Sequence, residues 1–181
     1  MQLCAYANTI ANKGTRLKAT FLRRVVSADY RTLIFDNEPE VISTMDNISA
    51  ETWDIVYSGM RKVTTMGGRI SGTATQYLGG FNDVTKADLP WPQDGVRWPM
   101  ANEVTVYAKT GTAEHASGGS NHASYIAFAS RKGGEPEVAI SVFGERAAHG
   151  AWLSPIVEDI LEVYFESVNA SEAYTYENQV G

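Results

Sequence analysis

The chain has 181 residues, of which 44% are hydrophobic and 20% charged, and this composition is typical of a single globular domain with a sizeable core. Its 15 basic and 21 acidic side chains give a net charge of -6 without a basic cluster, which argues against a surface that binds nucleic acid or anionic membranes. One cysteine excludes an internal disulfide, and we find neither a signal sequence nor a window with the ~20 apolar residues of a membrane span.

The N-terminal region predicts a helix followed by a hairpin. Apolar residues recur at helical spacing over residues 2–13, and Gly14 follows as a typical C-terminal residue. Tyr6 belongs to this apolar stripe, so we expect it to pack in the core. Short β-branched and aromatic runs on either side of a Ser-Ala-Asp turn predict a hairpin over residues 20–35.

The middle of the chain predicts one more helix and then a long loop. Ser49 is a good N-cap, and an apolar stripe with helical spacing continues from it to Gly67. Residues 67–102 show no periodicity and are rich in glycine, proline and tryptophan. We therefore expect a long ordered loop or lid there, and loops of that size are usually functional.

The C-terminal region predicts an antiparallel sheet covered by a helix, which makes the fold class α+β. Three strand-like runs begin near residues 103, 123 and 137 and are joined by glycine-rich loops. Ser154 and the proline after it begin a helix that we expect to end at Phe165. Its apolar residues should form one face that covers the sheet: Ile156, Val157, Ile160, Leu161 and Tyr164. Residues 1–165 then form one domain, and residues 166–181 form a loosely held tail.

The tetrapeptide Lys109-Thr110-Gly111-Thr112 ends the first of these strands and carries the candidate chemistry. Strand alternation places the hydroxyls of Thr110 and Thr112 on one side, where both can donate to one carboxylate. Lys109 adds a positive field, Gly111 gives clearance, and the backbone N–H of Thr112 is a candidate oxyanion donor. The alternative interpretation of these four residues is an ordinary strand end with a glycine turn.

Two neighbouring residues, Glu114 and His115, are further candidates for contact with a substrate because they follow the tetrapeptide directly. The other histidines, His122 and His149, lie at spacings that do not suit a zinc site. We expect no metal and no cofactor, and we expect these histidines to be exposed or bonded locally.

K-T-G is the third element of the acyl-enzyme set S-x-x-K, S-D-N and K-T-G. Other segments accompany it in a fixed order, and with it they span nearly all of residues 1–165: "AYANTIANKGT", "ETWDIVYSGMRKV", "GTA" at 72–74, "KTGTAE" and "FGERAAHGAWLSPIVEDIL". With this set the chain resembles the C-terminal half of the transpeptidase domain of class B penicillin-binding proteins. The resemblance implies a partial penicillin-binding transpeptidase fold, which is similar to that of serine β-lactamases.

The resemblance also implies a mechanism, partners and a location. A serine of S-x-x-K attacks the D-Ala-D-Ala bond of a peptidoglycan stem peptide, and penicillins acylate the same serine. Lys109 would hold the S-x-N serine and tune proton transfer, Thr110 and Thr112 would bind the terminal carboxylate, and the Thr112 N–H would form half of the oxyanion hole. The complete domain would act at the extracytoplasmic face of the bacterial cell membrane on stem peptides, and would bind β-lactams.

The chain departs from the family pattern in ways that bear on activity. No serine has a lysine three residues later, so the nucleophile and the other half of the oxyanion hole are missing. The segment 167–169 spells S-x-N, but it follows K-T-G and lies in the tail, so we discount it. Ala108 stands where the family usually has glycine, and its methyl group would narrow the site. We therefore expect this chain alone to be inactive.

Two other interpretations stay open: a β-lactam sensor or binding module without turnover, and a relative of the serine β-lactamases. "GTA" and "YANTIANKGT" favour the transpeptidase over the β-lactamase. Without the N-terminal half of the domain, the strand at residues 138–143 would have an unpaired edge, and we expect possible self-association through it.

Overall fold

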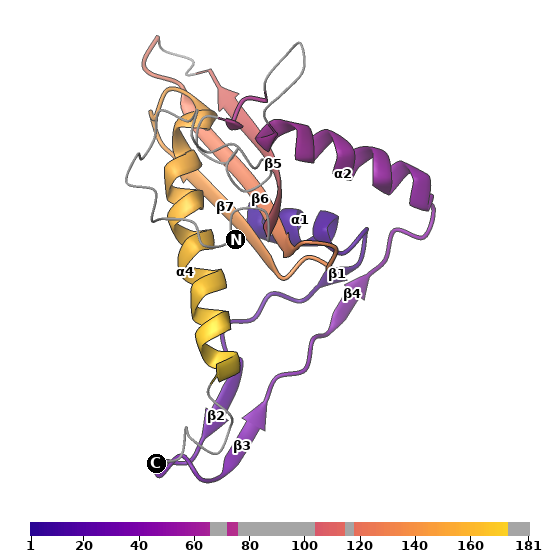
Figure 1. The fold of residues 1–181 in the computed structure, drawn as a ribbon, viewed down its shortest axis with the longest axis vertical. Coiled ribbons are helices and arrows are strands. Elements are labelled where there is room, and N and C mark those ends of the chain that lie inside the picture. Colours follow the sequence, from indigo (N-terminus) through magenta and orange to yellow (C-terminus); the bar gives the residue numbers. More distant parts are fainter. Residues whose placement is uncertain (66–71, 76–103, 115–117, 174–181) are drawn as a thin grey trace.

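The computed structural model describes residues 1–65, 72–75, 104–114 and 118–173, with side chains described as far as residue 165. An antiparallel sheet lies at the centre, helices cover both of its faces, and a narrow arm projects away from it (Figure 1). The predicted α+β class is confirmed. The predicted loop at residues 67–102 lies outside the described residues except for the turn at 72–75.

The central sheet consists of β5 (Val104–Ala113), β6 (His122–Arg131) and β7 (Val138–Gly144), in the order β5-β6-β7. Both pairs are antiparallel, so the prediction of three consecutive strands is confirmed. β5 continues through the K-T-G tetrapeptide to its end at Ala113. The alternative interpretation, a strand that ends there in a glycine turn, is therefore wrong.

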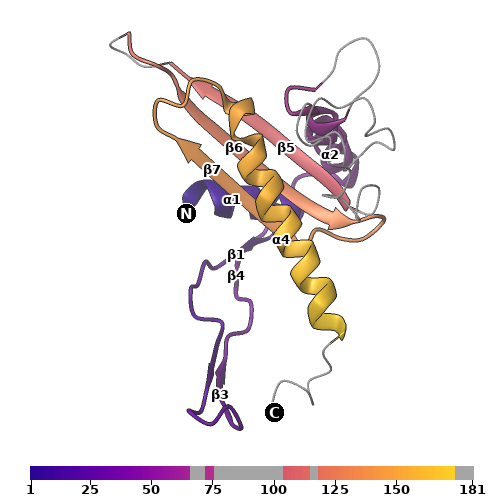
Figure 2. The ribbon, with the colours of Figure 1, turned by 60° about the vertical axis from the view of Figure 1, so that its left-hand side comes forward.

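One face of the sheet packs against α4 (Ser154–Ala173), which follows the short 3-10 helix η2 (Gly150–Leu153). Val157, Leu161 and Phe165 are fully buried there, and Figure 2 shows α4 lying across the strands. Burying aliphatic and aromatic side chains of this size stabilises the fold by about 1.5–3 kcal/mol each. This contact fixes η2 against the sheet.

The opposite face packs against α1 (Gln2–Ala11) and α2 (Ala50–Thr64), in a core that includes Phe128. Both helices were predicted, and the predicted N-cap is confirmed because Ser49 Oγ accepts the Thr52 N–H at 3.2 Å. The Tyr57 hydroxyl donates to the Ala11 carbonyl at 2.7 Å and so links α2 to the end of α1. Burial raises the pKa of Tyr57 to about 12, which keeps this hydroxyl a donor.

Three details differ from the expectations. Tyr6 is 57% exposed rather than packed in the core, because the buried stripe of α1 consists of Ala7, Ile10 and Ala11. Ile156 and Ile160 also face outward, although we assigned them to the buried face of the last helix. That helix continues past Phe165 to Ala173, so the expected loss of structure after Phe165 is wrong for this stretch.

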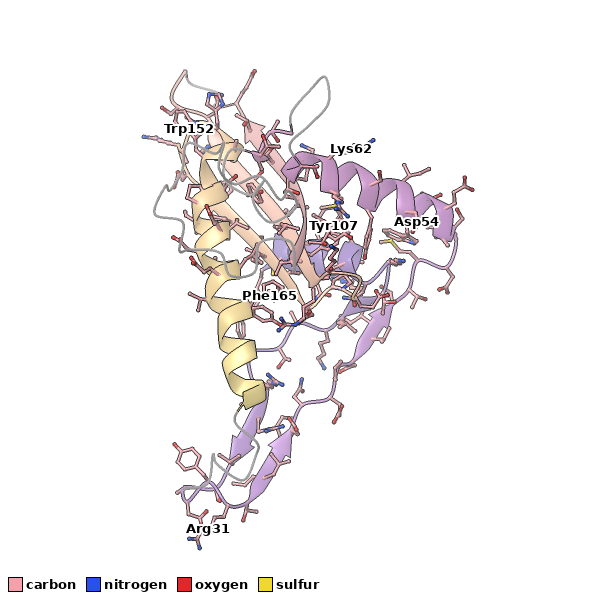
Figure 3. All side chains as sticks on the ribbon, in the orientation of Figure 1. Arg31, Asp54, Lys62, Tyr107, Trp152 and Phe165 are labelled. Atoms are coloured by element: carbon pink, nitrogen blue, oxygen red, sulfur yellow. The ribbon has the colours of Figure 1, made fainter. Side chains whose placement is uncertain are left out.

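Four short strands form the arm, and they are β1 (Arg16–Leu17), β2 (Arg24–Val26), β3 (Leu33–Asp36) and β4 (Val41–Ser43). β2 pairs with β3 as the predicted hairpin, whereas the β1–β4 pair was not predicted. Figure 3 places Arg31 at the far tip of the arm, well away from Phe165 and the sheet. Within the described residues, no helix is long and apolar enough to span a membrane.

Candidate functional site

The candidate site is the exposed end of β5, where the K-T-G tetrapeptide lies. Lys109 and Thr112 are exposed, and Thr110 and Gly111 are half-buried. Thr110 and Thr112 share one face of the strand because side chains alternate along it. Among the described strands β5 is also at the edge of the sheet, and an oxyanion donor on its outer side would require such a position.

Thr110 contacts a residue far from it in the sequence. Its hydroxyl lies 2.9 Å from the hydroxyl of Thr73, and either oxygen can be the donor. Thr73 belongs to the turn at 72–75, whose Ala74 N–H donates to the Val63 carbonyl at the end of α2 at 2.9 Å. The end of α2 therefore positions a hydroxyl beside the K-T-G strand.

Thr112 contacts the start of η2. The Gly150 N–H donates to Thr112 Oγ1 at 3.3 Å. A Cβ atom on Gly150 would lie 2.4 Å from the Gly111 carbonyl oxygen and 2.8 Å from its nitrogen. Only glycine at position 150 lets η2 approach the K-T-G strand this closely.

Gly111 has no side chain, and the space this leaves is filled by another residue of the same protein. A Cβ atom on Gly111 would lie 2.3 Å from Ser124 Oγ, and Ser124 is directly opposite it on β6. The glycine of K-T-G therefore leaves room for a cross-strand serine. Sequence reasoning missed Ser124 because it predicted the strands without their register.

The ammonium group of Lys109 lies against the backbone of β5. Its Nζ donates to the Thr110 carbonyl, and among the described residues it forms no salt bridge. The neighbouring Ala108 has no exposed surface and belongs to the core that packs against α4. The expectation that its methyl group narrows the site is therefore wrong.

The remaining candidate residues are Glu114 and the three histidines. Glu114 is exposed at the end of β5, and His115 lies outside the described residues. His122 stacks on Phe143, and its Nδ1 accepts the Arg146 N–H at 3.2 Å, while His149 makes an edge contact with Trp152. These two histidines have local partners, as predicted. The described part of the chain contains no group of three potential metal ligands.

Ser167-Val168-Asn169 lies within the backbone of α4. Three residues of the site were not predicted from the sequence: Thr73, Ser124 and Gly150. The sequence did contain a signal for Thr73, because the segment "GTA" at 72–74 was one of those that accompanied K-T-G in the resemblance. Nothing in the sequence indicated that its threonine contacts Thr110.

Comparisons with known proteins identify the family and the fold. The family model of the penicillin binding protein transpeptidase domain matches residues 1–162. A crystal structure of Pseudomonas aeruginosa PBP2 in complex with WCK 5153 matches the fold with a TM-score of 0.56 and 22% identity. The match covers 90% of this chain and 28% of that chain, so these residues span less than a third of the length of that protein. No curated protein sequence matches.

The family model covers most of the sequence, and the solved structure has a similar fold. In this chain, K-T-G lies on a strand at the edge of the described sheet. The chain belongs to the penicillin-binding protein transpeptidase domain family.

Proposed function

We propose that this chain is the C-terminal part of the transpeptidase domain of a class B penicillin-binding protein, acting on peptidoglycan stem peptides at the extracytoplasmic face of the membrane. The observation that carries the proposal is the pair of hydroxyls of Thr110 and Thr112 on one face of an exposed strand end, beside Lys109. Two O–H donors and one ammonium group suit a carboxylate, which has only acceptor sites.

In this proposal each residue has a separate task. Thr110 and Thr112 bind the terminal carboxylate of the stem peptide, or the equivalent carboxylate of a β-lactam. Lys109 supplies positive potential and holds the serine of S-x-N. The Thr112 N–H stabilises the negative charge that develops on the attacked carbonyl oxygen. Glu114 and His115 lie next to this strand end in the sequence and are candidates for contact with the rest of the peptide.

The attacking serine must come from outside residues 1–181, since none of their serines has a lysine three residues later. The segment that carries S-x-x-K is then the structural partner that completes the site. We expect this chain alone to remain unmodified by a fluorescent penicillin, as judged by a denaturing gel. A covalent fluorescent band on this chain would contradict the proposal, because it would require a nucleophile within these residues.

The substitution Thr112→Val tests carboxylate recognition. It is made in the complete transpeptidase that contains these residues and the S-x-x-K serine. The change removes a hydroxyl donor and leaves the backbone N–H in place. A charge-assisted hydrogen bond is worth about 1.5–3 kcal/mol, so the acylation rate constant for penicillin should fall by roughly ten- to a hundredfold.

Thr112→Ser is the matched control, because it keeps the hydroxyl and should retain most of the rate. The change His115→Ala, in the adjacent segment, should lower the rate less than Thr112→Val does. Equal rates for Thr112→Val and the parent protein would rule out the assignment of Thr112 to the carboxylate.

A further inference from the structure

The hydroxyls of Thr110 and Thr112 have different kinds of hydrogen-bond partner. Thr112 Oγ1 accepts a hydrogen bond from the Gly150 N–H, and a backbone N–H can only donate. Among the described residues the single proton of the Thr112 hydroxyl has no acceptor, so it is available to a ligand. Thr110 instead faces the hydroxyl of Thr73 at 2.9 Å, and two hydroxyls can bond in either direction.

A bound carboxylate decides the direction of that bond. Because an ionised carboxylate has no proton, Thr110 can bind it only as the donor. Thr110 then has no proton for Thr73, and Thr73 must donate to the Thr110 oxygen. We propose that Thr73 is a positioning residue that donates to Thr110 and so directs the Thr110 proton to the substrate carboxylate; this inference rests on the proposed function of the strand.

The turn that carries Thr73 is fixed by backbone contacts. Gly72 lies so close to the end of α2 that a Cβ atom there would be 2.1 Å from the Lys62 carbonyl oxygen and 2.3 Å from that of Val63. The Ala74 N–H bonds to the same Val63 carbonyl, and the Ala74 side chain has no exposed surface. The turn thus docks between α2 and the core.

The end of α2 is in turn bound to β5. The Thr64 hydroxyl is buried and donates to the Val106 carbonyl on β5 at 2.8 Å. A buried hydroxyl with a good acceptor is costly to displace, since separation would leave polar groups unpaired. Thr73 and Thr110 are therefore held together by the described residues themselves, before any ligand binds.

The test is Thr73→Val in the transpeptidase that contains these residues and its S-x-x-K serine, with the penicillin acylation rate constant as the readout. Loss of one neutral hydrogen bond should lower the rate constant by about two- to tenfold. Thr73→Ser should restore the rate because it keeps the hydroxyl. Thr65→Val is the matched control: within the described residues its hydroxyl bonds to the Arg61 carbonyl at the end of α2, at 2.8 Å, and the rate should not change.

A double-mutant cycle separates positioning from a general structural effect. If Thr73 acts through Thr110, then Thr73→Val should lower the rate constant by less than about 1.5-fold in a Thr110→Val background. An undiminished effect in that background would overturn the inference, as would a normal rate for Thr73→Val alone. Thermal unfolding identifies a misfolded variant, in which case Thr73→Ala replaces it in the cycle.

Failure of the inference and failure of the proposed function give different results. If Thr110→Val lowers acylation and Thr73→Val does not, the strand still binds the carboxylate and only the role of Thr73 is wrong. If Thr110→Val itself has no effect, carboxylate recognition by Thr110 is wrong, and the role of Thr73 falls with it.

Discussion

Gly111 is confined from two sides, by Ser124 of the neighbouring strand and by Gly150 of η2. An added methyl group would overlap Ser124 Oγ, so Gly111→Ala requires the serine side chain to rotate or the strands to shift. Overpacking of this kind costs about 1–3 kcal/mol. We expect the free energy of unfolding of Gly111→Ala, measured in urea, to fall by about 1–2 kcal/mol.

Two further variants make this prediction specific. Ser124→Ala in the Gly111→Ala background should recover most of the loss, because it removes the overlapping oxygen. Gly59→Ala is the control: a Cβ atom there meets nothing within 4 Å, and alanine in a helix interior should stabilise the chain by about 1 kcal/mol. A Gly111→Ala variant as stable as the parent would show that the strand end adapts without cost.

The residue types of the tetrapeptide are the basis for its proposed role in carboxylate binding, but the sequence could not predict which residues support them. Lys109 and the two threonines follow from hydroxyls and charge at alternating strand positions. Thr73 and Gly150 are supports contributed by the turn after α2 and by η2. Their contacts depend on how distant segments dock, and local periodicity contains no such information.

At the scale of elements, β7 lies at one edge of the sheet. Among the described strands only β6 pairs with it, and no charged residue or proline lies between Val138 and Gly144. An uncharged edge of this kind recruits other strands. We expect the isolated chain to self-associate through β7 and Phe143→Lys to shift it toward monomer in analytical ultracentrifugation, since Phe143 is 64% exposed.

Phe21→Lys is the matched control, because Phe21 is 88% exposed and lies in the arm between β1 and β2. Ile140 is unsuitable for the test: it is only 6% exposed, and a lysine there would disrupt the core. A wild-type chain that stays monomeric while the amides of residues 138–143 exchange rapidly would show that the edge is tolerated.

The sequence predicted which segments form helices and strands, but it predicted only in part which face of each element is buried. In α4 two apolar stripes run side by side, one through Ile156 and Ile160 and the other through Val157 and Leu161. Periodicity alone cannot decide which stripe meets the sheet, because both have helical spacing. The packing selects the second stripe and leaves the first exposed.

At the scale of the whole molecule, the outer part of the arm, β2 and β3, projects away from the core (Figure 1). β2 and β3 pair with each other, and two exposed ion pairs, Arg24–Asp36 at 2.9 Å and Lys18–Glu40 at 2.7 Å, join its two sides. Exposed pairs of this kind contribute little, about 0–1 kcal/mol each. α1, which precedes the arm, is instead held by the core around Phe128.

Because of this separation, we expect the covalent link through the arm to be dispensable once the chain has folded. Trypsin should cut after Arg31 at the tip, and the released peptide with α1 should still elute with the sheet in native gel filtration. Dissociation of that peptide would show that the core does not retain α1. If the two pieces stay together, the arm is a suitable site at which to divide the polypeptide into separately expressed halves that reassemble, or at which to place the new termini of a circular permutant.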